Sequence, residues 1–155
     1  MSWNIELLII KPKLTDFDQI GLIDIATKEK DDLPFWEASS YSEIEEGLAI
    51  GNFDESTILI DPSCRLSNAL PRLIKDLNSH KVLFTRVADQ SICKQFIHGK
   101  EQKESMFKSL FSKKNAVNDE STAWEFIEKN TGLSAGSSDP KKDINNSKYS
   151  LYVLG

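Results

Sequence analysis

Thr57-Ile58-Leu59-Ile60-Asp61-Pro62 opens the stretch of sequence that decides the fold. Its apolar, β-branched residues predict a strand, which Asp61-Pro62 ends. A helix with one buried face is predicted next by apolar residues spaced i, i+4, i+7, i+8 and i+11: Leu66, Leu70, Leu73, Ile74 and Leu77. Lys81–Val87 is a second predicted strand. This order predicts a right-handed crossover between two parallel strands, or else a helix that only folds across the sheet.

We expect this crossover, from strand 57–61 through helix 68–78 to strand 82–87, to form the core. Asn68 is the best candidate for the N-cap of the helix. That start places Pro71 at the third helical position, where its missing N–H has no intrahelical partner to lose.

On the N-terminal side, residues 5–10 form an apolar run that predicts a buried strand ended by Lys11-Pro12. Residues 14–25 fit either a short helix or a strand, and Lys28–Asp32 is expected to be a charged connector. Ser42-Glu43-Ile44-Glu45 has the spacing of a capping box, which predicts a helical turn ending at Gly47. Gly51-Asn52 is expected to be a turn.

On the C-terminal side, residues 82–107 predict an antiparallel meander with a turn at His98-Gly99. Thr122-Ala123-Trp124-Glu125 has a second capping-box spacing, which predicts a short helix to Asn130 with Gly132 as its stop. Residues 134–148 are the least hydrophobic stretch and are expected to be mobile. Tyr149–Leu154 is expected to return to the sheet as a strand.

These elements predict an α+β fold for residues 1–155 as a single domain. We expect a mixed, mainly antiparallel sheet of five or six strands with two or three helices. No signal peptide or membrane segment is expected, since the longest apolar run, Leu7–Ile10, is far too short to span a bilayer. The two cysteines, Cys64 and Cys93, are too few for a disulfide scaffold, so we expect reduced thiols in a cytosolic protein.

Charge is distributed unevenly along the chain. Between Lys30 and Arg65 there are nine acidic residues and no Lys or Arg, so this block carries −9 while the whole chain carries −5. The segment from Lys81 to Lys114 is basic, with eight basic residues against three acids. A pI near 5.1 disfavours nucleic acid as a partner. A surface of one sign attracts a partner of the opposite sign.

The acidic block has two interpretations. It is either a solvated face that the basic segment of the same molecule partly neutralises, or a docking surface for a basic protein. Aromatic residues that anchor interfaces lie in the same block and favour the docking surface. We expect its contact residues to be Trp36, Glu37, Tyr41, Glu43, Glu45, Glu46, Asp54 and Glu55.

Catalytic signals are weak by comparison. Cys64 lies between a predicted strand and a predicted helix, a position that can lower a thiol pKa, but no phosphatase spacing follows it. His80 and His98 have no nucleophile or carboxylate at a diagnostic spacing. Asp54 and Asp61 could pair as acid and base, or hold a cation with Glu55, although turn carboxylates more often act as solvated caps. We expect no cofactor and no metal site.

The segment Thr57–Ser105 runs from Ile60-Asp61-Pro62 through the leucine-rich helix to His98-Gly99-Lys100. It resembles small bacterial domains, some of which are similar to the cytosolic immunity proteins that neutralise polymorphic toxins. The resemblance implies a non-enzymatic binder of one toxin and assigns no site residue.

Our leading hypothesis is therefore a cytosolic protein-binding module that contacts a basic protein, such as a toxin, through its acidic face. The alternative is a small hydrolase or transferase with Cys64 or His98 in a cleft. A third possibility is an adaptor whose basic meander, with Lys100 and Lys103, contacts an acidic partner.

Overall fold

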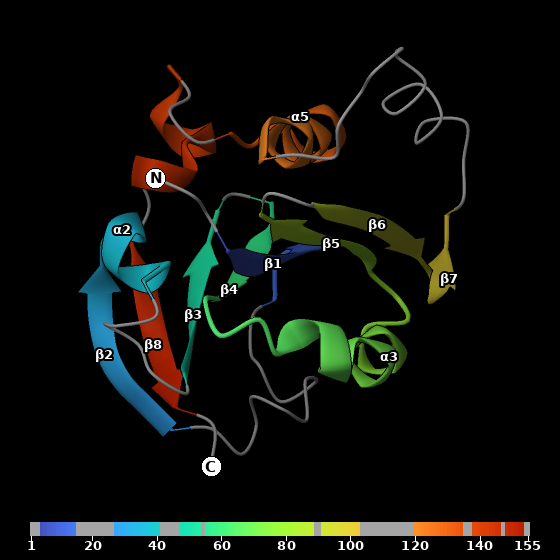
Figure 1. Ribbon diagram of the computed structural model, residues 1–155, viewed down its shortest axis with the longest axis horizontal. Coiled ribbons are helices and arrows are strands. Elements are labelled where there is room, and N and C mark those ends of the chain that lie inside the picture. Colours follow the sequence, from blue (N-terminus) through green and yellow to red (C-terminus); the bar gives the residue numbers. More distant parts are fainter. Residues whose placement is uncertain are drawn as a thin grey trace.

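The computed structural model describes residues 4–14, 27–40, 47–53, 55–88, 91–102, 120–134, 138–146 and 148–153 (Figure 1). They include an eight-stranded sheet with the strand order β2-β8-β3-β4-β1-β5-β6-β7. Every neighbouring pair in this sheet is antiparallel. The strands are β1 (Ile5–Lys11), β2 (Thr27–Leu33), β3 (Gly47–Asn52), β4 (Thr57–Asp61), β5 (Lys81–Val87), β6 (Ile92–Ile97), β7 (Lys100–Glu101) and β8 (Tyr149–Val153).

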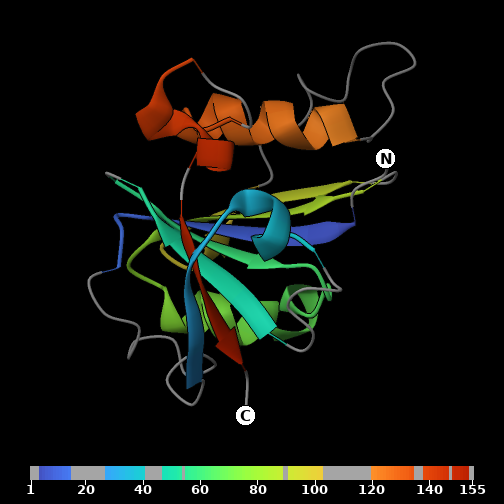
Figure 2. The same cartoon turned by 90° about the vertical axis from the view of Figure 1, so that its left-hand side faces the viewer.

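Helices cover both faces of the sheet (Figure 2). One face packs against α3 (Leu66–Asp76). The other face packs against α5 (Glu120–Thr131) and the short helix α2 (Phe35–Ala38), together with the 3-10 helix η2 (Ile144–Asn146). A second 3-10 helix, η1 (Pro140–Lys142), comes just before η2 in the chain. The described residues therefore form three layers, with the sheet in the middle.

The central strand β1 contributes to both sides of the core. Ile5, Leu7 and Ile9 belong to the apolar cluster on the α5 side, whereas Leu8 and Ile10 belong to the cluster on the α3 side. Successive side chains of a strand point to opposite faces, so a strand covered on both sides must be apolar almost throughout. This explains the uninterrupted apolar run from Leu7 to Ile10.

Among the described residues, no helix combines the length and apolar character needed to cross a bilayer.

The predicted α+β class is confirmed, but the prediction of the sheet was partly wrong. The sheet has eight strands instead of five or six, and it is antiparallel between all described neighbours instead of mixed. β4 and β5 both pair antiparallel with β1, so they run parallel to each other with β1 between them. The crossover through α3 therefore exists, but it skips over one strand. The three described α-helices agree with the prediction of two or three.

The start of α3 differs from the prediction. The helix begins at Leu66, and its N-cap residue is Arg65 instead of Asn68. The Asp61 carboxylate accepts hydrogen bonds from three backbone N–H groups: Ser63 at 2.9 Å, Arg65 at 2.6 Å and Leu66 at 3.1 Å. Pro71 lies inside the helix on its exposed side, not in its third position. The predicted buried face of the helix is confirmed.

The strand β2 was not predicted, because Lys28–Asp32 was expected to be a connector. β2 lies at one edge of the described sheet and pairs there with β8, with two register shifts along the pair. Charged side chains and irregular pairing are features by which edge strands avoid pairing with other chains. The charges that hid this strand in the sequence are therefore compatible with its place in the sheet.

The strand β3 overturns two further expectations. Gly47 and Gly51-Asn52 were expected to end a helical turn and to form a turn, but all three belong to β3. Gly51 is needed for packing: a Cβ atom there would lie 2.5 Å from ring carbons of Tyr149 on the neighbouring strand β8. The capping box predicted at 42–45 lies outside the described residues, as do residues 15–26.

The C-terminal half follows the predictions more closely. β5, β6 and β7 form the expected meander as far as residue 102, and its turn has positive φ at both His98 and Gly99. α5 ends before Gly132, also at positive φ, but it begins at Glu120, so Thr122 lies within the helix instead of capping it. β8 returns to the sheet as predicted. The described residues 138–146 contain η1 and η2, while the mobility expected for 134–148 stays a prediction.

Candidate functional site

The short helix α2 presents an exposed aromatic residue. Trp36 exposes 66% of its surface, while the other exposed large hydrophobic residues of the described chain, Ile92 and Ile97, expose 36% and 38%. We call the exposed side of α2, with Trp36 and Glu37, the α2 surface. Phe35, next to Trp36 in the chain, is buried. The helix therefore places one aromatic ring in the core and the next one in solvent.

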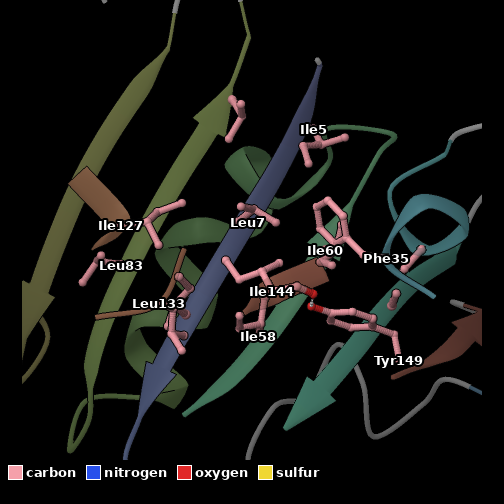
Figure 3. Packing of buried hydrophobic residues seen from close by; sticks show 14 of the residues in the cluster. Ile5, Leu7, Phe35, Ile58, Ile60, Leu83, Ile127, Leu133, Ile144 and Tyr149 are labelled. Carbon is pink, nitrogen blue, oxygen red and sulfur yellow. Dashed lines mark hydrogen bonds between the residues drawn. The ribbon is translucent and has the colours of Figure 1, made fainter. Parts of the chain in front are cut away.

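Phe35 anchors α2 to α5 and to the sheet. Its ring makes an edge contact with Trp124 of α5 at a centroid distance of 6.4 Å, and a tilted contact with Tyr149 of β8 at 6.1 Å. The Tyr149 hydroxyl donates a buried hydrogen bond of 2.8 Å to the carbonyl of Ile144 in η2 (Figure 3). Trp36 is thus carried by a helix that is packed in place, and a backbone held in place loses less entropy on binding.

Of the eight predicted contact residues, the structure describes three. Trp36 and Glu37 lie on α2, and Glu55 lies in the connection between β3 and β4. The other five lie outside the described residues: Tyr41, Glu43, Glu45, Glu46 and Asp54.

The acidic block does not form one continuous surface among the described residues. Asp61 is buried and accepts hydrogen bonds at the start of α3, and burial raises its pKa. It is therefore not the acid, base or cation ligand in a cleft that we considered from the sequence. Asp31 lies on the edge strand β2, where its pKa is lowered by hydrogen bonds from Ser150 and Lys28. Of the described acids in this block, Glu37 is the one that lies on α2 with Trp36.

A pocket lies beside η1. Its volume is about 330 Å³, and its lining comes from the β3–β4 connection, the C-terminal end of α5 and η1: Phe53, Glu55, Ser56, Thr131, Leu133, Asp139 and Lys142. We call it the η1 pocket. α2 packs against η2, which follows η1 in the chain. The helix α2 and the η1 pocket therefore involve two successive parts of one short segment, η2 and η1.

The wall of the η1 pocket is held by backbone hydrogen bonds. The Ser134 N–H donates to the Lys142 carbonyl at 3.0 Å, and the Ile144 N–H donates to the Ser134 carbonyl at 2.9 Å. Ile144 itself is fully buried. Thr131 hydrogen-bonds within its own turn, donating to the Ile127 carbonyl at 2.6 Å and accepting from the Leu133 N–H at 3.1 Å. The pocket is therefore built from anchored backbone.

A second group of charged residues lies at the start of α3. Glu6 of β1 is completely buried, and its carboxylate accepts hydrogen bonds from Arg86 of β5 at 2.6 and 3.0 Å. It also accepts a bond of 2.9 Å from the backbone N–H of Ser67. Asp61, on β4, is the cross-strand neighbour of Glu6, on β1. Together the two carboxylates accept hydrogen bonds from the first N–H groups of α3, so this group connects the helix to the sheet.

The geometry around Cys64 does not favour an activated thiol. Its sulfur lies 3.5 Å from the carbonyl oxygen of Asn4. Burial, with the nearby Glu6 carboxylate, raises the thiol pKa to about 11. A nucleophilic cysteine needs a lowered pKa, because the thiolate is the reactive form. The position at a helix N-terminus is outweighed, since Asp61 and Glu6 already accept hydrogen bonds there.

Neither histidine lies in the η1 pocket. His98 is exposed in the turn between β6 and β7. His80 is nearly buried before β5, its Nδ1 lies 3.2 Å from the Ser79 hydroxyl, and burial lowers its pKa. Within the described ranges, no three side chains of the His, Cys, Asp and Glu types gather as metal ligands.

Sequence reasoning missed the pocket and the Glu6–Arg86 pair. Asp139 and Lys142 fell in a segment expected to be mobile, so nothing marked them as pocket residues. Glu6 carried a signal, because an acid inside an apolar strand must find a partner if both faces of that strand are covered. Arg86, in the other predicted central strand, is that partner.

Comparisons of the chain with models of protein families, with curated proteins and with solved structures found no match.

Proposed function

We propose that the chain is a non-enzymatic protein-binding module that contacts a basic protein partner through the α2 surface and the acidic residues around it. The observation that carries the proposal is Trp36, which exposes 66% of its surface on a helix held in place by Phe35. Tryptophan is enriched among residues that dominate binding energy, and a partner would bury a large apolar area there.

The charge of the chain supports a basic partner. The block from Asp31 to Asp61 contains nine acids and no bases, and only Asp61 among the described acids of this block is buried. Complementary charge accelerates association and disfavours partners of the wrong sign. A toxin neutralised by an immunity protein is the kind of basic partner that we propose, and the cytosol is the proposed compartment.

The test is affinity capture from the native lysate at low and high salt, followed by mass spectrometry. We expect one basic protein that salt releases, because surface charges are screened as ionic strength rises. Trp36→Ala should abolish capture, and so should joint reversal of Glu43, Glu45 and Glu46 to Lys. The matched control is Ile97→Ala, which removes another exposed apolar side chain and should leave capture unchanged.

Stability must be measured on the same variants. The melting temperature of each should stay close to that of the parent protein. Trp36 and Ile97 are exposed, and Glu43, Glu45 and Glu46 are expected to lie on the surface. Capture that survives both the Trp36 and the charge-reversal variants would contradict the proposal.

A further inference from the structure

The η1 pocket combines an apolar floor with a charged rim. Phe53 and Leu133 are buried, with 8% and 5% exposure, and form its apolar part. Glu55, Asp139 and Lys142 are exposed and surround it. Lysine and arginine side chains have a complementary construction, because an aliphatic stem carries a charged head that stays near water.

We propose that the η1 pocket accepts a lysine or arginine side chain of the basic partner, with the stem against Phe53 and Leu133 and the cationic head at Glu55 and Asp139. This inference rests on the proposed function, because it assigns the pocket to the same partner that contacts Trp36. A volume of about 330 Å³ accommodates one such side chain with water around its head.

The protein already shows that Glu55 can bind an ammonium group. Lys11 Nζ lies 3.3 Å from the Glu55 carboxylate, and both side chains are mostly exposed, at 51% and 74%. Ion pairs this exposed are weak and exchange readily. A partner lysine or arginine would therefore replace Lys11 at Glu55 and gain the apolar contacts of the pocket in addition.

Lys142 provides a sharp test of charge. Among the described residues of the lining it is the one cation, beside the carboxylates of Glu55 and Asp139, so it opposes an incoming cation. Its removal should strengthen binding of a cationic side chain, whereas removal of the Glu55 charge should weaken it. A pocket that bound apolar ligands alone would not show this opposite response.

The experiment is an NMR titration of the ¹⁵N-labelled full chain with Nα-acetyl-lysinamide at low salt. Nα-acetyl-norleucinamide, which has a similar aliphatic stem without the ammonium group, is the matched probe. We expect the lysine probe to shift the amide signals of Ser56, Leu133 and Lys142 and the norleucine probe to leave them nearly unchanged. Glu55→Gln should weaken binding of the lysine probe about two- to fivefold, and Lys142→Gln should strengthen it by a similar factor.

Three results would overturn the inference: equal shifts with both probes, shifts confined to residues away from the pocket, or no shifts at all. Its failure can be told from failure of the proposed function, because the probe titration does not involve Trp36. If Trp36→Ala abolishes capture of the partner while the lysine probe fails to bind, the binding module stands and the pocket assignment falls. If the probe binds as expected but no partner is captured, the pocket assignment is supported and the proposed function is contradicted.

Discussion

Glu6 and Arg86 are cross-strand partners on β1 and β5, and Arg86 Nη2 lies 2.6 Å from the Glu6 carboxylate. Glu6 has no exposed surface, whereas 30% of the Arg86 side chain is exposed. The buried carboxylate therefore depends on one arginine that reaches it from the surface and on the backbone N–H of Ser67. Loss of either partner leaves a charge in the interior.

We expect Arg86→Met to lower the free energy of unfolding by about 3 kcal/mol, because breaking a buried pair leaves its partner charge uncompensated. The double variant Glu6→Leu/Arg86→Met should recover more than half of this loss. Urea unfolding measures both. Lys28→Met, which breaks the exposed pair with Asp31, is the control and should leave the unfolding midpoint nearly unchanged. If Arg86→Met is as stable as the parent protein, Glu6 is not buried as a charge.

Phe35 and Trp36 should separate stability from binding. Phe35→Ala removes a buried ring that contacts Trp124 and Tyr149, so we expect a loss of about 3–5 kcal/mol. Trp36→Ala removes an exposed ring and should change stability by less than about 0.5 kcal/mol. Thermal and urea unfolding of the two variants give the comparison. A large loss for Trp36→Ala would mean that this ring is packed in solution.

Gly51→Ala should destabilise the protein by about 1–3 kcal/mol, because the new methyl group would overlap the ring of Tyr149. Tyr149 is buried and cannot move aside into solvent. A double-mutant cycle with Tyr149→Leu identifies the cause. The combined cost should be smaller than the sum of the single costs, and simple additivity would contradict a clash between these two residues.

His80 should make stability depend on pH. Burial lowers its pKa below the ordinary value of 6.5, so the folded state favours neutral imidazole. Its contribution to stability is complete above pH 6.5 and is lost as the pH falls through the lower folded-state pKa. The parent protein should therefore lose more stability than His80→Gln between about pH 7.5 and pH 5. Equal losses for the two proteins would contradict a buried, neutral His80.

Cys64 should react slowly with thiol reagents. With a thiol pKa of about 11, it holds far less thiolate near neutral pH than a free cysteine. We expect iodoacetamide to modify it at least about tenfold more slowly than free cysteine at the same pH. Cys64→Ser isolates the signal of Cys93, whose pKa burial raises to about 12. Rapid labelling of Cys64 in the folded protein would revive the hydrolase or transferase alternative.

The sequence predicted those elements whose pattern is local. The buried face of α3 was readable because one helix repeats its apolar residues over consecutive turns. β4 and β5 were readable because both of their faces are covered, which makes their middle residues, 58–60 and 82–84, apolar without interruption. The turn at His98-Gly99 was readable because glycine allows the positive φ that such turns require.

Elements that depend on distant residues were missed. β2 consists mostly of charged residues, and only its pairing with β8, more than a hundred residues later, makes it a strand. Gly51 was expected in a turn because nothing nearby shows the Tyr149 ring that requires a glycine. Asp61 was expected to end a strand, yet its side chain also accepts a hydrogen bond from the first residue of a helix, Leu66, five residues later. A charge count along the chain could not show that this acid is buried.

The position of β8 has a consequence for synthesis on the ribosome. Among the described strands, β2 has β8 as its one neighbour in the sheet, and β3 has β8 on one side. When β2 and β3 of a nascent chain have emerged from the exit tunnel, β8, the strand that lies between them in the sheet, is still missing. It becomes available only when residues 149–153 have also emerged. During translation the β4-β1-β5-β6 part of the sheet can assemble first, while β2 waits without a partner. The half of the sheet that carries α2 and Trp36 is therefore completed late, after nearly all of residues 1–155 have been translated.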